Sequence, residues 1–177
     1  MKKIFVMAAM VLGVSAAYAG DSEPLKAITK SKTYAEAEAL LNSTLDQLAS
    51  PQEKAKAYNK LYELSMKDFE TVSAVIAENQ RAAVMKTEQQ AYDTAAYYNS
   101  AYNAVKAAVE CDKYDGQPDA KGKTKIAYRK DETRLQKLTQ ARLELVNGGQ
   151  WIDGKNDEAG LLKYWGLFLE SRNTHLF

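Results

Sequence analysis

The sequence predicts an all-α protein built as a stack of antiparallel helical hairpins. Two observations about composition favour helix over sheet: three prolines and nine glycines occur in 177 residues, and alanine, lysine, glutamate and leucine are abundant. A third observation is periodicity, because apolar residues recur at steps of three and four along most of the chain. Hydrophobic residues make up 46% of the chain, which is enough to build a core and argues against wholesale disorder.

The first 19 residues have the pattern of a secretory signal peptide. Lys2 and Lys3 form a positive start, an apolar run follows at 4–14, and Ala17-Tyr18-Ala19 is a cleavage signal. The run is too short to span a bilayer comfortably, although an uncleaved anchor is the alternative. We therefore expect a signal peptide at 1–19, a mature domain at 20–177 without a membrane span, and export to the periplasm or exterior of a bacterial cell.

The charge balance argues against a nucleic-acid partner. The chain has 24 basic and 23 acidic residues, and removal of Lys2 and Lys3 changes the net charge from 24 − 23 = +1 to 22 − 23 = −1. Nucleic-acid binding depends on a basic field that neutralises phosphates, and this chain has none.

The first elements of the mature chain are a lead-in and a capped helix. The polar segment 21–32 is expected to be irregular. A helix is predicted at 34–48 from one apolar stripe, formed by Tyr34, Ala37, Leu41, Leu45 and Leu48. The tetrad from Ser50 to Glu53 is a capping box with proline at the first helical position, so a second helix begins at Pro51.

The middle of the chain predicts two long helices and a loop. The second helix has no glycine or proline before Thr87 and is expected to reach about residue 85, unless it breaks near Ser65 or Ser73. A weaker capping box at 87–90 begins a third helix that ends near Cys111. The segment 112–125 contains Gly116, Pro118 and Gly122, which predicts a surface loop.

Two further helices complete the expected set of about five. A fourth helix is predicted from residue 131, with its inward face formed by Leu135, Leu138, Leu143 and Val146. After a turn at 153–156, a last helix is predicted at 159–171. Cys111 is the only cysteine, so an intrachain disulfide is excluded and the thiol is expected to be buried.

Two parts of the chain share an arrangement of small and aromatic residues. Near the C-terminus its members are Gly148, Gly149, Trp151 or Ile152, Gly160 or Leu161, and Tyr164 or Trp165. Near the N-terminus its members are Tyr34, Ala37 and Pro51, followed in register by Ala55, Tyr58, Asn59 and Tyr62. This arrangement resembles the tetratricopeptide repeat, a helix-turn-helix unit of about 34 residues.

Taken whole, the chain looks like the N-terminal region of exported tetratricopeptide-type proteins of Bacteroidetes, in a short or truncated form. The strings at 110–115, 147–150 and 162–166 look typical of that group. The resemblance implies a right-handed stack of hairpins with a concave surface that binds a protein or peptide. Carried over residue by residue, its groove positions are Glu53, Lys56, Lys60 and Glu63. An uncapped last helix also implies possible self-association.

The tyrosines suggest a second kind of binding site. Of eleven tyrosines, Tyr97, Tyr98 and Tyr102 form an aromatic cluster on one predicted helix. Helical spacing favours core packing, but adjacent Tyr97 and Tyr98 cannot face the same way, so one could line a groove for a peptide or sugar. Thr94 lies in a triplet, 93–95, that resembles the O-glycosylation acceptor of Bacteroidetes.

No arrangement of residues predicts catalysis, a metal or a cofactor. His175 is the only histidine, which makes a Ser-His-Asp triad or a multi-histidine zinc site implausible. Asp112, Asp115 and Asp119 do not have EF-hand spacing and are expected in a solvated loop. We therefore expect a non-catalytic exported scaffold that binds a protein or peptide; the alternative is a helical protein that binds a small molecule or glycan in a tyrosine-lined groove.

Overall fold

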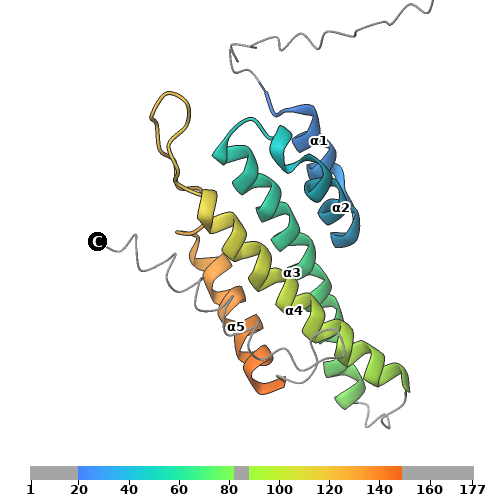
Figure 1. Cartoon of the computed structure of the whole chain (residues 1–177). Helices are drawn as coiled ribbons and strands as arrows, with labels where there is room; N and C mark the ends of the chain where they lie inside the picture. Colours follow the sequence, from blue (N-terminus) through green and yellow to red (C-terminus); the bar gives the residue numbers. More distant parts are fainter. Residues whose placement is uncertain (1–19, 82–87, 149–177) are drawn as a thin grey trace, which may run out of the picture.

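The computed structural model describes residues 20–81 and 88–148, and all regular secondary structure in this part of the chain is helical (Figure 1). It contains α1 (Glu23–Lys30), α2 (Tyr34–Thr44), the 3-10 helix η1 (Leu45–Gln47), α3 (Pro51–Arg81), α4 (Glu88–Tyr114) and α5 (Glu132–Gly148). The all-α class is therefore confirmed. The cap at Thr87, the side chain of Thr94 and the helix expected at 159–171 lie outside the residues or side chains that the structure describes.

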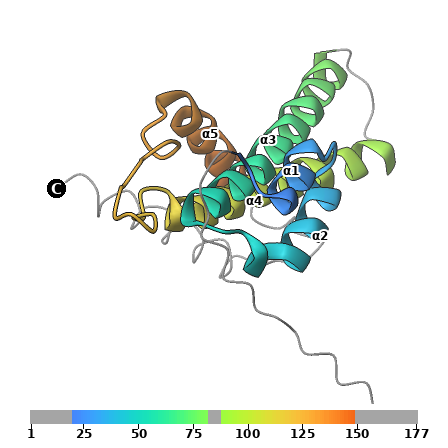
Figure 2. The ribbon, with the colours of Figure 1, turned by 90° about the horizontal axis from the view of Figure 1, so that it is seen from above.

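The long helices α3 and α4 form the centre of the fold (Figure 1). They run side by side as a hairpin and make the most extensive contact between any two elements in the described chain. The short helices α1 and α2 pack against α3, while α5 packs against α4. Seen from above, the α1–α2 pair and α5 lie on opposite sides of the hairpin (Figure 2).

The segment expected to be an irregular lead-in is instead helix α1. Ser22 caps it, its hydroxyl accepting a hydrogen bond from the backbone N–H of Leu25. Leu25 and Ile28 are fully buried against the rest of the core. An eight-residue helix is marginal in isolation, so its stability comes from this packing, which the polar composition of 21–32 does not reveal.

The capping box predicted at the start of the second helix is present, except that the Glu53 carboxylate bonds the backbone of Ala49 in place of that of Ser50. The backbone N–H of Glu53 donates to the hydroxyl of Ser50 at 3.2 Å, as expected. The carboxylate of Glu53 reaches past Ser50 and accepts from the backbone N–H of Ala49 at 2.8 Å. The preceding helix is shorter than predicted, because α2 ends at Thr44 and the chain tightens into η1.

The second and third helices agree with the prediction. Helix α3 continues through Ser65 and Ser73 without a break, and α4 passes Cys111 by one further turn. Cys111 is fully buried, as expected. The core draws on all five α-helices, and its largest members with full burial are Leu25, Ile28, Leu41, Phe69, Val109, Leu138 and Leu145.

The inward face predicted for the fourth helix was partly wrong. Leu138 is fully buried and Leu135 packs against the core, but Leu143 is 51% exposed. The buried apolar positions among the described side chains of α5 are instead Leu138, Ala141 and Leu145, which recur at steps of three and four. Ala141 is fully buried in the core, whereas the larger Leu143 is not.

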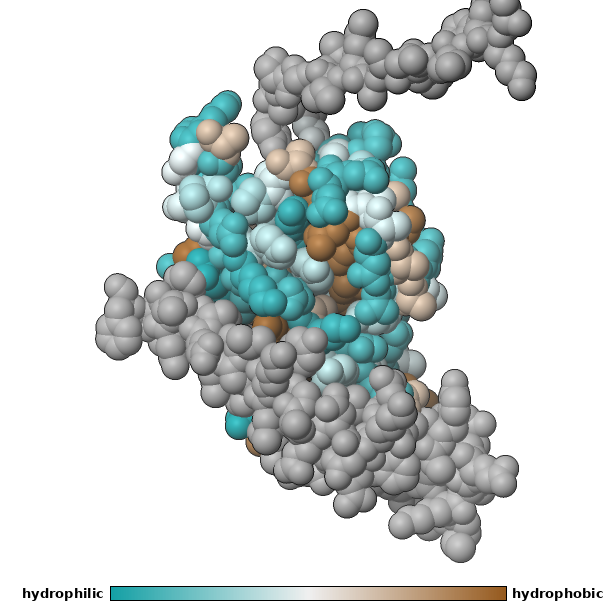
Figure 3. Space-filling view, in the orientation of Figure 1, coloured by the Kyte–Doolittle hydropathy of each residue, from teal (hydrophilic) through white to brown (hydrophobic). Residues whose placement is uncertain are grey.

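The described surface in the view of Figure 3 is largely hydrophilic, with small apolar areas between polar ones. Among residues 20–81 and 88–148, no helix is long and apolar enough to cross a membrane.

Candidate binding groove

A groove with a volume of about 430 Å³ lies between α2, α3 and α4. We call it the polar groove, because most of the described residues that line it carry a hydroxyl, carboxamide or carboxylate group, although more of the surface that they expose to it is apolar than polar. It is lined by Thr33, Tyr34 and Ala35 at the start of α2, Ser65, Asp68, Thr71 and Val72 on α3, and Ala96, Asn99, Ser100 and Asn103 on α4. A volume of this size falls in the usual range of small-ligand and peptide-side-chain sites.

Helical geometry brings this lining together. On α3 the positions 65, 68 and 72 are separated by three and four residues, as are 96, 99 and 103 on α4, so each set lies on one face. The two faces border the same space because α3 and α4 pack as a hairpin. The first turn of α2 closes one end, where Thr33 caps the helix by accepting from the N–H of Glu36 at 3.3 Å.

Ser65 provides the one buried polar atom in the groove lining without a partner. Its side chain is 1% exposed, and within the described structure its hydroxyl oxygen has no hydrogen bond. A buried hydroxyl normally makes a hydrogen bond, because leaving it without one costs about 1–3 kcal/mol.

Among the described residues of the lining, Asp68 carries the only ionisable carboxyl group, and none of them is a lysine or arginine. Partial burial raises the pKa of Asp68, and the neighbouring charge of Lys67 opposes that shift. None of the ion pairs found among the described residues includes Asp68. The groove is therefore weakly acidic.

The predicted aromatic cluster lies elsewhere. The ring of Tyr97 is buried and stacks on Phe69 with centroids 4.6 Å apart, and Tyr98 meets Tyr97 edge-on at 5.3 Å. Burial, with the nearby carboxylate of Glu144, raises the pKa of Tyr97. Tyr97, Tyr98 and Tyr102 pack in or against the core, and none of them lines the polar groove. The tyrosine that does line it is Tyr34.

The four groove positions carried over from the repeat resemblance do not share a cavity. The carboxylate of Glu53 is used inside the fold, accepting from Ala49 and from the backbone and hydroxyl of Ser22. Lys56 pairs with Asp21 at 2.6 Å and borders a smaller cavity of about 160 Å³. Lys60 is half-buried, and Glu63 is exposed and accepts from Asn59 at 2.8 Å.

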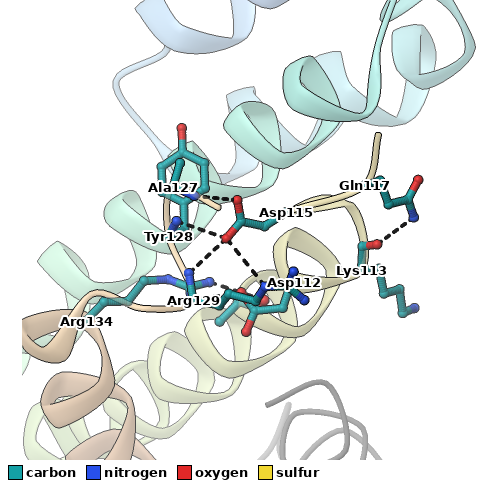
Figure 4. Close-up of polar contacts among 9 residues, drawn as sticks. Asp112, Lys113, Asp115, Gln117, Ala127, Tyr128, Arg129 and Arg134 are labelled. Atoms are coloured by element: carbon teal, nitrogen blue, oxygen red, sulfur yellow. Dashed lines mark hydrogen bonds and ion pairs between the residues drawn. The ribbon is translucent and has the colours of Figure 1, made fainter. Parts of the chain in front are cut away.

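A second polar cluster lies where α4 meets the loop at 115–131 (Figure 4). The buried carboxylate of Asp115 accepts backbone hydrogen bonds from Ala127, Tyr128 and Arg129 at 2.8–3.0 Å. The buried guanidinium of Arg134 donates to Asp112 at 2.9 Å. The expectation of a solvated loop was therefore wrong for these two aspartates: they anchor the loop and α5 onto the end of α4.

The thiol of Cys111 belongs to the same region, and burial raises its pKa. A thiol held in its neutral form is a poor nucleophile, which fits a packing role. Over the residues searched, no group of histidine, cysteine and carboxylate side chains could hold a metal ion.

A signal for the polar groove does exist in the sequence. Asn99 and Asn103 lie one turn apart on a helix whose other positions are mostly alanine, tyrosine and valine. Small polar residues in a helix interior do not improve helix propensity, so their presence hints at another use. Which helix face they meet cannot be read from spacing alone.

Comparison with protein-family models, with curated proteins and with solved structures gives no match for this chain.

Proposed function

We propose that the mature chain is an exported, non-catalytic helical scaffold that binds an extended peptide segment of a partner protein in the polar groove. The observation that carries this proposal is the cavity of about 430 Å³, lined from three helices by groups that can donate or accept hydrogen bonds.

The spacing on α4 suits a peptide backbone. A carboxamide offers both donors and acceptors, as a peptide unit does. Asn99 and Asn103 lie four residues apart on α4, which corresponds to a rise of about 6 Å. In an extended chain, residues i and i+2 point to the same side and lie about 6.6 Å apart. The spacing of peptide groups along one side of an extended ligand would therefore match the spacing of the two carboxamides.

The kinship with tetratricopeptide proteins and the right-handed hairpin stack are part of this proposal. The pairing of α1 with α2 and of α3 with α4 is compatible with stacked hairpins. Helix α3 alone has 31 residues, about the length of a whole tetratricopeptide unit, so the middle of the chain departs from the family's pattern.

A pair of tryptophan variants tests the binding site. Ala35 and Ala39 are both exposed positions on α2, one turn apart, but only Ala35 lines the groove. Binding of the mature protein would be measured on an array of random octapeptides attached through their C-termini, and then in solution for the best sequence. We expect Ala35→Trp to weaken binding by about tenfold or more, equivalent to about 1.4 kcal/mol, and Ala39→Trp to leave it unchanged.

The outcomes separate the two classes of ligand. If no peptide binds, or if both tryptophan variants bind as the parent does, the peptide proposal fails. A panel of neutral oligosaccharides would be titrated in parallel. If the protein binds a sugar but no peptide, and Ala35→Trp abolishes the sugar binding, the glycan-binding hypothesis replaces the peptide-scaffold hypothesis. Tyr34 would then be the aromatic residue that contacts the sugar.

Export is tested separately by expressing the full chain in a Gram-negative host and sequencing the N-terminus of the periplasmic product. We expect cleavage after Ala19, so that the mature chain begins at Gly20. Asp21 and Ser22 would then follow the new terminus, and both are bound to α3. Retention of 1–19 or a cytoplasmic product would contradict export.

A further inference from the structure

Two hydroxyl groups in the lining of the polar groove already donate their protons to backbone carbonyls of their own helices. The hydroxyl of Thr71 donates its proton to the carbonyl of Lys67 at 2.8 Å, and that of Ser100 donates to the carbonyl of Tyr97 at 2.9 Å. A hydroxyl has one proton, so both oxygens present only lone pairs to the groove. The walls from α3 and α4 therefore contain two hydroxyls that can act only as acceptors.

Asp68 adds a third acceptor group beside these two hydroxyls, while the carboxamides of Asn99 and Asn103 offer both donors and acceptors. An ionised carboxylate is acceptor-only, and Asp68 faces the same cavity as Thr71 and Ser100. None of the described residues that line the groove is cationic, and the neighbouring Lys67 does not form an ion pair with Asp68. A ligand that brings hydrogen-bond donors and a positive charge would satisfy these oxygens, whereas an anionic ligand would be repelled.

The groove also has an apolar part suited to a hydrocarbon stem. Val72 and Ala96 line it, and both are partly buried. An alkyl chain that ends in a charged group commonly packs its methylenes on such a surface while the charge is hydrogen-bonded beyond it. An ammonium group fits the polar part well, because it has three donors and no acceptor.

We propose that the polar groove recognises a protonated primary amine, with Asp68 as its counter-ion and the oxygens of Thr71 and Ser100 as further acceptors. This inference rests on the proposed function and specifies its ligand: the peptide segment carries a lysine side chain or a free N-terminus. The same chemistry is shared by free aliphatic diamines, so the test includes both sources.

The test uses the mature protein and three pairs of probes. The first pair is a lysine-containing octapeptide taken from the array and its Nε-acetyllysine form. The second is the same peptide with a free and with an acetylated N-terminus. The third is 1,5-diaminopentane and the neutral 1,5-pentanediol. Dissociation constants would be measured by calorimetry or by chemical-shift titration for the parent protein, Asp68→Asn and the control Asp46→Asn.

Asp46 is a suitable control because it is an exposed aspartate in η1, outside the groove. We expect acetylation of one of the two amines to weaken binding to the parent protein by about tenfold or more. Asp68→Asn should abolish that difference, and Asp46→Asn should preserve it. Both aspartates are exposed, so circular dichroism and the melting temperature should be unchanged in the two variants.

The possible results are distinguishable. If neither acetylation changes affinity, or if Asp46→Asn acts as strongly as Asp68→Asn, the amine proposal is overturned. The peptide site still stands in that case, provided that Ala35→Trp blocks binding. If 1,5-diaminopentane binds as tightly as the best peptide and the diol does not bind, the amine proposal holds with a free diamine as the ligand. Preference for the peptide identifies a protein partner.

Discussion

Glu53 and Ser22, 31 residues apart, are joined by two hydrogen bonds that tie the start of the mature chain to α3. The carboxylate of Glu53 accepts from the backbone N–H of Ser22 at 2.7 Å and from its hydroxyl at 2.9 Å. It also accepts from the N–H of Ala49. A single carboxylate thus satisfies the entry to α1 and the entry to α3 together.

Glu53→Gln should destabilise the protein by about 2–3 kcal/mol. The substitution replaces one carboxylate oxygen by an NH₂ group, which cannot accept the hydrogen bonds that Ser22 and Ala49 donate to Glu53. Chemical denaturation would measure the change in unfolding free energy. Glu63→Gln is the control: it makes the same change on an exposed residue of α3 and should cost less than about 0.5 kcal/mol. Equal effects of the two substitutions would show that the hydrogen bonds of Glu53 do not contribute measurably to the free energy of unfolding.

The two loop glycines predict different responses to alanine. Gly116 has φ +89° and a Cβ there would lie 2.1 Å from Nη2 of Arg129, so Gly116→Ala combines backbone strain with a clash. Gly122 has φ +73° with no atom within 4 Å, so Gly122→Ala carries only the strain, about 1 kcal/mol. We expect the melting temperature to fall several degrees further for Gly116→Ala; an equal fall would show that Arg129 moves aside at no cost.

Arg134→Met should destabilise the protein by about 3–5 kcal/mol at pH 7, because it leaves the carboxylate of Asp112 buried and unpaired. Arg134 also donates to the carbonyl of Ala108 and lies over the ring of Tyr62, so it contributes packing as well. Adding Asp112→Leu should restore much of the loss. Lys137→Met, which breaks an exposed ion pair with Glu70, should cost less than about 1 kcal/mol.

The same variant should show a defined pH dependence. Burial already raises the pKa of Asp112 above 3.8, and loss of Arg134 would raise that pKa further. Between the unfolded and the folded pKa the native state binds more protons than the unfolded state, so stability falls as pH rises. The destabilisation by Arg134→Met should therefore be smaller near pH 4 than near pH 7. A loss that does not depend on pH would contradict the assignment.

Three tyrosines predict the alkaline behaviour. Burial is the main cause that raises the pKa of Tyr58, Tyr62 and Tyr128 from 10.0 to about 12. The folded protein retains these phenolic protons where the unfolded chain has lost them, so stability should fall between pH 10 and pH 12. Denaturant midpoints across this range would measure the fall, and Tyr62→Phe should make it shallower. Phenolate absorbance that is complete by pH 10.5 in folded protein would contradict the prediction.

Local signals in the sequence accounted for the long elements. The capping box from Ser50 to Glu53 placed the start of α3, and the absence of glycine and proline predicted its length. These features act over one or two turns, so neighbouring residues alone determine them. The same reasoning failed for α1, whose two buried residues, Leu25 and Ile28, make a stripe too short to recognise without the surface that they cover.

The sequence by itself determined that this protein is helical, where its long helices begin, and that Cys111 would be buried, because propensity, capping and periodicity are local properties. Only the tertiary structure decided how the polar residues are used. It buried Asp112 and Asp115 with arginines and backbone donors, engaged Glu53 with Ser22, and brought Ser65, Asp68 and Asn103 around one groove. Those outcomes depend on which faces of distant helices meet, and helical periodicity does not encode that pairing.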